Sequence, residues 1–441
     1  MHILLLILLL ALPSFAMDEL KDKNYADLFS PALPYVEIYA NTAPRVWEMY
    51  TDAVKEDKKR LSEHKKKEIR YNKKIMKYAS KKVGEKDANG YPLYIALHGG
   101  GGSPARVNNS QYEHMKVYYL NSVKKGIYVA PRGVTNTWNL HTVKESYALY
   151  DRLIENMILF EDVDPNRVYI MGFSAGGDGT YQLAPRMTDR WAAASMSAGH
   201  PNGISPRNLY NLPFLIQVGA YDKAYKRHHE AVKYGQRIMA HQQQEKGGYP
   251  HQVNIHFGRG HNFLDNHSKE IPQKIMVKPV EWMKTGRSAI KNENTNAIRW
   301  LSKHVRNPLP KRIVWDLKTR APRSALGLWT SPARGNRFYW LGYDKKSDKE
   351  VIASYAPKSN TVKIEKAIDG LRVYLNQKML NLKVPVLFDI EGQQLKLTIN
   401  ASIRNLAITA RERGDENYLF EGLVIITKKD NKWSALSEIA E

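Results

Sequence analysis

Residues 171–177 of this 441-residue chain read MGFSAGG and follow the apolar run RVYIM. An apolar run that leads into Gly-x-Ser-x-Gly allows two interpretations. One is a glycine-rich turn between a strand and a helix, in which Ser174 caps the helix. The other is a nucleophile elbow, a strained strand-to-helix turn that exposes the serine hydroxyl. Seven residues do not separate the two, so the rest of the chain must supply the partners that such a serine needs.

The first sixteen residues, MHILLLILLLALPSFA, have the pattern of a signal peptide. Their apolar run is followed by Pro13 and by the small residues Ser14 and Ala16, which suits cleavage before Met17. The run is too short to span a bilayer. We therefore expect an exported protein, periplasmic or secreted, with no transmembrane segment in the mature chain.

The composition is that of a folded protein. Hydrophobic residues make up 43% of the chain, and 26 Tyr and 9 Trp can help to fill sizeable cores. The chain contains no cysteine, so it can form no stabilising disulfide bonds and can carry no lipid anchor on a cysteine. Its stability must come from core burial.

Part of the formal net charge of +23 is local. Residues 55–82 hold thirteen Lys or Arg against four Asp or Glu, a net charge of +9. Apolar residues such as Leu61 and Ile69 interrupt this basic arm, which favours a solvated helical face. Contact with an anionic polysaccharide or membrane surface is the alternative. A nucleic-acid partner is not expected, because no binding motif is present.

Strand-like and helical segments alternate through the first two thirds of the chain. Strand-like runs lie at residues 91–97, 126–130, 167–171, 191–196, 213–218 and 251–257. Such alternation predicts an α/β fold with a mainly parallel sheet and helices on both faces. We place this domain at residues 88–305, after a helical N-terminal arm at residues 17–87.

A second domain is predicted after a polar stretch that ends in RNPLPK. Short β-rich runs such as RIVWDL, VPVLFDI and LAITARE follow, spaced about ten residues apart and separated by turn residues such as EGQQ. This pattern predicts an all-β, sandwich-like domain over residues 312–434.

If Ser174 is a nucleophile, the fold must supply oxyanion donors before it. The strand YPLYIAL runs into His98 and four glycines, a loop of the HGGG type. We expect the backbone N–H groups of Gly99 and Gly100, together with that of Ala175, to face a developing oxyanion.

An acid and a base follow the elbow. Asp222 comes after the buried run PFLIQV, and His261 comes after the last strand of the predicted sheet. The separations along the chain are 48 and 39 residues. Ser174, Asp222 and His261 therefore occur in the order nucleophile, acid, base that α/β-hydrolases use.

Other residues at strand ends are candidates for substrate contact. Trp138, Asn139 and His141 follow the run GIYVA, and His200 follows the strand after the elbow. Loops at the carboxyl ends of parallel strands line the ligand crevice, although Trp138 could also only pack. Asp178 is a further candidate for substrate contact. It lies four residues past Ser174, where a helix-terminus or supporting role fits better than membership of a triad.

Metal binding is the alternative for the histidines. His98, His141, His200 and His261 show no H-x-x-x-H or H-x-x-E-H spacing. We expect neither a metal nor another cofactor.

Several runs together resemble exported bacterial α/β-hydrolases of the polyhydroxybutyrate depolymerase and feruloyl esterase type. These are HGGGGSP, YVAPRG, TWNL, DPNRVYIMGFSAGGDGTYQLAPRM, SAGHPN and GRGH, within residues 88–262. The β-rich continuation is similar to a C-terminal domain found in one branch of that group. The resemblance implies a serine hydrolase of carboxylic esters, with the triad carried over to Ser174, Asp222 and His261. The stretch after His261 is longer than the group's pattern, which leaves the pocket and the substrate open.

The expected function is ester hydrolysis through an acyl-enzyme, on a small ester or on an acylated saccharide or polymer. Two alternatives remain. A serine peptidase can use the same triad, and an inactive hydrolase fold can serve as a polysaccharide-binding protein.

Overall fold

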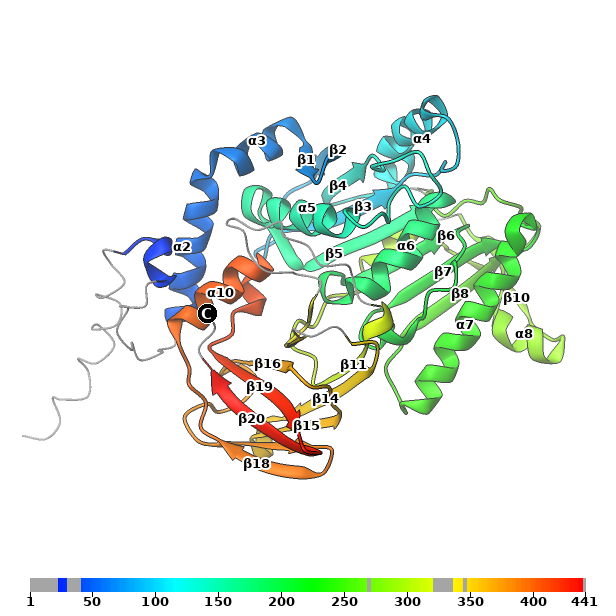
Figure 1. The fold of residues 1–441 in the computed structure, drawn as a ribbon. Coiled ribbons are helices and arrows are strands. Elements are labelled where there is room, and N and C mark those ends of the chain that lie inside the picture. The colour runs from blue at the N-terminus through cyan, green and yellow to red at the C-terminus, as the bar shows by residue number, and fades with distance from the viewer. Residues whose placement is uncertain (1–22, 30–40, 268–270, 320–335, 344–346, 439–441) are drawn as a thin grey trace, which may run out of the picture. The chain divides into compact units, whose positions relative to one another are not determined.

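The computed structural model of the chain forms two compact units (Figure 1). It describes residues 23–29, 41–267, 271–319, 336–343 and 347–438. The larger unit comprises residues 62–326, and the smaller unit comprises residues 1–61 and 327–441. The predicted signal peptide, residues 1–16, lies outside the described residues. The domain boundaries expected at residues 88–305 and 312–434 stay predictions.

A mainly parallel sheet forms the centre of the larger unit. Its strand order is β1-β2-β4-β3-β5-β6-β7-β8-β9-β10, and β3 to β8 are parallel to their neighbours within that group. The edge strands β1, β2, β9 and β10 pair antiparallel. The bounds are β1 (Glu68–Tyr71), β2 (Lys74–Val83), β3 (Tyr91–Leu97), β4 (Gly126–Pro131), β5 (Val163–Phe173), β6 (Ala193–Ser197), β7 (Phe214–Gly219), β8 (His251–His256), β9 (Gln273–Met276) and β10 (Ile290–Glu293).

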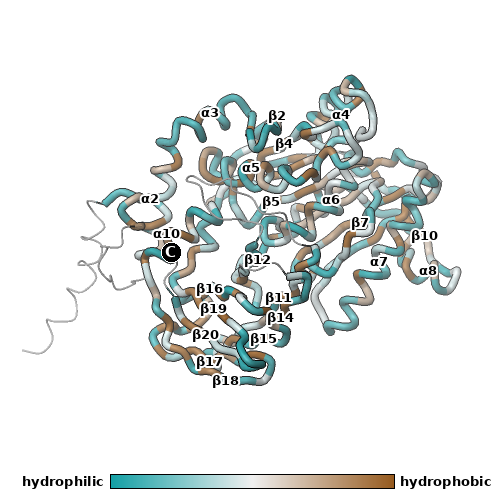
Figure 2. Tube along the Cα trace, in the orientation of Figure 1, coloured by the Kyte–Doolittle hydropathy of each residue, from teal (hydrophilic) through white to brown (hydrophobic). Residues whose placement is uncertain are grey.

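Hydrophobic cores lie on both faces of this sheet, and the central strands are rich in hydrophobic residues (Figure 2). In β3, Leu93 and Ile95 belong to the core under α5, α6 and α7, whereas Tyr94 belongs to the core under α4 and α9. This alternation is the period of a strand that is covered on both sides. The predicted α/β fold is thereby confirmed. The helices are α4 (Ala105–Tyr118), α5 (Ser146–Glu161), α6 (Ala175–Arg186), α7 (Arg227–Gln244), α8 (Pro279–Thr285) and α9 (Ala297–Leu301).

The N-terminal arm is helical over only part of its predicted length. Helices α2 (Thr42–Glu56) and α3 (Lys58–Lys66) are followed by the hairpin of β1 and β2. The prediction of helix up to residue 87 is therefore wrong for this hairpin. Asn72 and Lys73 both have positive φ, as a two-residue hairpin turn requires, and Met76 and Tyr78 point into the core at the period of a strand.

Two further sheets make up most of the smaller unit. One contains β14, β15, β17 and β18, and the other has the order β12-β13-β16-β19-β20. Neighbouring strands are antiparallel except for the parallel pair β15 and β17. The bounds are β12 (Arg337–Phe338), β13 (Leu341–Tyr343), β14 (Glu350–Ala356), β15 (Thr361–Lys366), β16 (Leu371–Leu375), β17 (Val386–Ile390), β18 (Gln393–Leu397), β19 (Gly422–Lys429) and β20 (Lys432–Glu438). The predicted β-rich character of this region is confirmed.

One run in this region was predicted as a strand and is a helix. LAITARE lies within α10 (Ile403–Arg413). The Ser402 side chain caps this helix by accepting from Asn405 N, and Gly414 ends it in the left-handed conformation. These local signals outweigh the β-branched residues of the run.

Strand β11 (Arg312–Asp316) belongs to the larger unit, where Asn208 and Asn211 bond to its backbone. In the part of the chain described, every helix is too short or too polar to cross a membrane.

Candidate active site

Ser174 sits in a sharp turn between β5 and α6. Its φ of 59° and ψ of −123° are unusual for a residue with a side chain. The two flanking glycines are required by close backbone approach. A Cβ on Gly172 would lie 2.1 Å from the carbonyl oxygen of Gly176, and a Cβ on Gly176 would lie 2.0 Å from that of Leu97. The Gly-x-Ser-x-Gly pattern therefore has the steric cause expected of an elbow.

Two loops at the carboxyl end of the sheet bring a histidine and a carboxylate to this serine. The Ser174 hydroxyl lies 3.0 Å from His261 Nε2, and His261 Nδ1 lies 2.8 Å from Asp222 Oδ2. Asp222 is buried after β7, and the two loops are joined by the bond from Tyr221 N to Arg259 O at 2.8 Å. The sequence-predicted Ser174, Asp222 and His261 thus lie together, in a geometry that permits proton transfer from the serine.

The second carboxylate oxygen of Asp222 faces an arginine that sequence reasoning missed. Arg227 Nη1 lies 3.6 Å from Asp222 Oδ1, and His228 Nδ1 lies 2.9 Å from the Asp222 carbonyl oxygen. Both residues lie in the first turn of α7. The Arg227 guanidinium is thus a charged neighbour of Asp222 on the side away from His261. The signal that could have indicated Arg227 is its place directly after the acid loop.

The glycine loop after β3 lies against the elbow. A Cβ on Gly99 would come within 3.3 Å of Ser174 Cβ. Gly101 N donates to Asn108 Oδ1 at 2.8 Å, so that N–H is already occupied. Ala175 is the first residue of α6, where N–H groups have no acceptor within the helix. Gly99 and Ala175 therefore lie next to the serine, and the role of Gly99, Gly100 and Ala175 as oxyanion donors stays a prediction.

His98 fixes this loop from behind. Burial lowers its pKa to about 4, so the ring is neutral near pH 7. Its Nε2 accepts from Gly133 N at 3.0 Å, and its Nδ1 therefore donates to Gly99 O at 2.6 Å. The side chain acts as a brace for the loop.

His141 does not contact the cavity, which corrects the prediction for this residue. It is buried, and its Nδ1 and Nε2 lie 2.8 Å from Tyr150 Oη and 3.1 Å from His98 O. Burial and the neighbouring His98 lower its pKa well below the ordinary value. Its position after a strand predicts that His141 lines the ligand crevice. Instead, its ring packs in the core against the His98 ring, with 4.8 Å between the centroids.

A cavity of ≈ 560 Å³ is lined by Asp178, among other residues, and the Asp178 N–H donates to Ser174 O one helical turn back. Of the predicted substrate-binding residues, Trp138, Asn139, Asp178 and His200 line it. The remaining lining residues, which sequence reasoning did not single out, are Thr142, Tyr147, Gln182, Arg186, Asn202, Tyr225 and Arg227. Its volume is within the range of small-ligand sites.

Two aromatic side chains stand exposed at this cavity. Trp138 is 53% exposed and Tyr225 is 63% exposed, with ring centroids 5.7 Å apart. Asp178 adds an acidic group to the lining of the cavity. Its carboxylate accepts from His200 N at 2.7 Å and from Asn202 Nδ2 at 3.2 Å. Burial raises the pKa of Asp178. It supports the cavity wall, and its hydrogen bonds in the described part of the chain go to His200 and Asn202 instead of His261.

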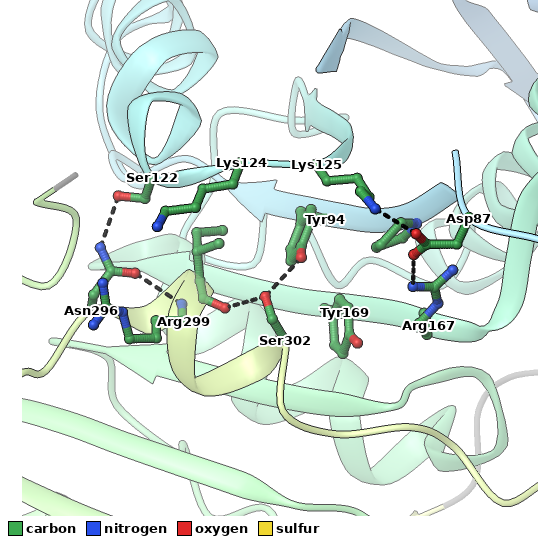
Figure 3. Close-up of a pocket in the computed structure, with 12 residues that line it drawn as sticks. Asp87, Tyr94, Ser122, Lys124, Lys125, Arg167, Tyr169, Asn296, Arg299 and Ser302 are labelled. Atoms are coloured by element: carbon green, nitrogen blue, oxygen red, sulfur yellow. Dashed lines mark hydrogen bonds and ion pairs between the residues drawn. The ribbon is translucent and has the colours of Figure 1, made fainter. Parts of the chain in front are cut away.

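Another pocket, of ≈ 380 Å³, lies beside the first half of β3 and the helix α9 (Figure 3). Lys125 and Arg167 both pair with Asp87, at 2.5 and 2.6 Å, and the Tyr94 hydroxyl lies 2.8 Å from Ser302 Oγ. The twelve lining residues include no histidine. This pocket therefore lacks the base that a serine nucleophile needs. Among the residues that the structure describes, no group of three or more His, Cys, Asp or Glu could hold a metal.

Comparison with known proteins places the region around this site in a hydrolase family. Residues 131–305 match the family described as Dienelactone hydrolase family. The chain thus contains a dienelactone hydrolase family domain, and the expected α/β-hydrolase type is confirmed by this match and by the sheet topology.

One sequence relative is a bifunctional acetylxylan esterase/xylanase of Neocallimastix patriciarum, 31% identical over 113 residues. The matched stretch is 25% of this chain, and the chain spans only 16% of that relative's length. Solved structures with a similar fold include a thermostable esterase (18% identity, 54% of this chain and 62% of that one, TM-score 0.37). A poly(3-hydroxybutyrate) depolymerase of Bordetella parapertussis is also similar (16% identity, 52% and 88%, TM-score 0.35).

Proposed function

We propose that this protein is a serine hydrolase that cleaves carboxylic esters through an acyl-enzyme. The observation that carries the proposal is the continuous hydrogen-bonded series from Ser174 Oγ through the His261 ring to the buried carboxylate of Asp222. A serine in this setting is activated by the adjacent base, and the carboxylate holds the base in the productive tautomer.

In the proposed reaction, Ser174 Oγ attacks the ester carbonyl while its proton passes to His261 Nε2. The oxyanion that forms accepts from the N–H groups of Ala175 and of Gly99 or Gly100. His261, now protonated and held by Asp222, gives its proton to the departing alcohol. Water then attacks the acyl-enzyme with His261 as base, which releases the acid and restores Ser174.

We further propose an acylated saccharide or polymer as the substrate class. The exposed faces of Trp138 and Tyr225 offer flat apolar surface beside the site, on which the apolar face of a sugar ring can lie. The amides of Asn139 and Asn202 and the carboxylate of Asp178 lie in the same cavity and can bond to hydroxyl groups. The charged and aromatic lining suits such a ligand better than a long acyl chain. Export to the periplasm or the medium, which the first sixteen residues predict, would give access to it.

The test is a panel of acetyl, feruloyl, short-chain and long-chain esters, with an amide of matched acyl group, on the purified protein. We expect hydrolysis of acetyl or feruloyl saccharide esters, little hydrolysis of the amide, and loss of activity in Ser174→Ala. Ser288→Ala, at a half-buried position between α8 and β10, is the matched control and should keep full activity. Cleavage of the amide alone would favour the peptidase alternative, and no turnover with intact binding of a polysaccharide would favour the inactive one.

A further inference from the structure

The loop that carries His261 ends at a buried carboxylate that the proposed chemistry does not use. Asp265 is 0% exposed and lies four residues beyond His261. Three hydroxyl groups surround its carboxylate: Ser197 Oγ at 2.5 Å, Tyr119 Oη at 2.8 Å and Tyr118 Oη at 3.1 Å. No Lys, Arg or His in the described part of the chain forms an ion pair with it.

A buried carboxylate without a counter-ion is costly to keep. Removing the group from water disfavours its charged form, and burial accordingly raises the pKa of Asp265. Hydroxyl donors offset this cost only in part. An apolar residue would fill the same space more cheaply, so the position calls for a reason beyond packing.

Ser197 links this carboxylate to the nucleophile. Its carbonyl oxygen accepts from Ser174 N at 3.0 Å, and its side chain donates to Asp265. Strand β6 pairs with β5 so that Ser197 stands beside Phe173, the residue before the nucleophile. The turn that holds Ser174 and the loop that holds His261 are therefore fastened to one residue of β6.

The neighbours of Asp265 are held in the same way. Ser122 Oγ donates to Asn266 O at 2.7 Å, and Asn296 Nδ2 donates to His267 O at 2.5 Å. Ser122 and Asn296 also bond to each other, as Figure 3 shows. The end of the loop is thus tied by side chains to the segments that follow α4 and precede α9.

Aromatic packing closes the space between the two fastened segments. The Phe173 ring lies 5.4 Å from the His261 ring and 5.6 Å from the Tyr118 ring, measured between centroids. A shift of the Asp265 end of the loop would therefore be transmitted to the imidazole through packed groups.

We propose that Asp265 is a positioning residue that, with Ser197 and Tyr119, sets the distance between His261 and Ser174. This inference rests on the proposed function, because it assigns His261 the role of base. Asp265 itself touches no reacting atom. A displacement of about 1 Å between a base and its nucleophile can lower the rate by about 10²-fold, so modest loosening of the loop is enough to affect turnover.

The test compares Tyr119→Phe with Tyr128→Phe. Both tyrosines belong to the same core, and each loses one buried hydroxyl: that of Tyr119 bonds to Asp265, and that of Tyr128 bonds to Met115 O at 2.6 Å. The two changes should lower the melting temperature by similar amounts. Only Tyr119→Phe should lower kcat for a small ester, by between about 10-fold and 10²-fold, with KM unchanged.

Asp265→Asn and Asp265→Ala extend the comparison. The amide keeps one acceptor oxygen for the hydroxyl groups, so Asp265→Asn should retain more of kcat than Asp265→Ala. Ser197→Ala and Tyr119→Phe replace these variants if they fail to fold. Equal kcat in Tyr119→Phe and Tyr128→Phe would overturn the inference and leave the proposed function standing, since the wild type would still lose activity in Ser174→Ala. A wild type without esterase activity would overturn both.

Discussion

His261 Nδ1 lies 2.8 Å from Asp222 Oδ2. This contact identifies Asp222, and not the nearby carboxylate of Asp178, as the partner of the histidine. Asp178 bonds instead to His200 N and Asn202 Nδ2. Asp222→Asn should therefore lower kcat strongly, on the order of 10⁴-fold, because the imidazole loses the partner that fixes its tautomer. Asp178→Asn should cost far less. Steady-state kinetics measures kcat of both variants, with folding checked by circular dichroism. A larger loss of kcat in Asp178→Asn would show that Asp222 is not the acid of the triad.

Stability should depend on pH through Glu421 in the smaller unit. This side chain is buried, accepts from Gln377 N at 3.0 Å, and has its pKa raised to about 7 chiefly by burial. An acid whose pKa is higher in the folded state gives full stability below its unfolded pKa, near 4.5, and loses it as the pH rises to about 7.

Glu421→Gln removes this titration and keeps an acceptor for Gln377 N. We expect the variant to exceed the wild type by up to about 3 kcal/mol in unfolding free energy at pH 8, with the difference vanishing near pH 4.5. Urea unfolding at the two pH values measures it. A difference that does not change with pH would show that Glu421 ionises normally.

Activity should not require a metal ion. The proposed mechanism uses only Ser174, His261, Asp222 and backbone N–H groups. Dialysis against EDTA should leave kcat within about twofold of the untreated enzyme. Loss of activity on chelation, with recovery on adding zinc, would instead indicate a metal-dependent reaction.

The basic arm at residues 55–82 should govern retention on anionic polymers and not catalysis. Lys73, Lys74 and Lys81 are among its residues that reach solvent. Binding to an acidic polysaccharide should fall steeply above physiological salt, where the Debye length is below about 8 Å, while turnover of a neutral small ester stays constant. Replacing these three lysines with Gln should weaken retention alone. Retention that is insensitive to salt, or absent at low salt, would show that the basic arm is a solvated surface that does not bind anionic polymers.

Much of the larger unit could be predicted because its strands carry their own signal. The run YPLYIAL is apolar on both faces, as a strand covered on both sides must be, and so is the run before Ser174. The hairpin of β1 and β2 was missed because its exposed lysines hide a period of two. The helix at LAITARE was missed because β-branched residues outweighed its capping residues in the sequence.

Some residues of the candidate site could be predicted from the sequence and others could not. Ser174, Asp222 and His261 each follow a strand of a parallel sheet, and topology alone brings such positions together. His141 has the same kind of position, but it packs against His98 in the core, which only tertiary structure decides. Asp265 was missed because its role depends on contacts with residues distant in the sequence. Arg227 was missed because its contact with Asp222 depends on the first turn of α7.

The role of Ser174 as nucleophile is tested by covalent labelling with a fluorophosphonate, followed by mass spectrometry of the labelled peptide. We expect one modified residue, Ser174, in the wild type. We expect no labelling in Ser174→Ala, with esterase activity lowered on the order of 10³-fold or more and the fold retained. Labelling of a different serine, or unchanged esterase activity in folded Ser174→Ala, would contradict this role.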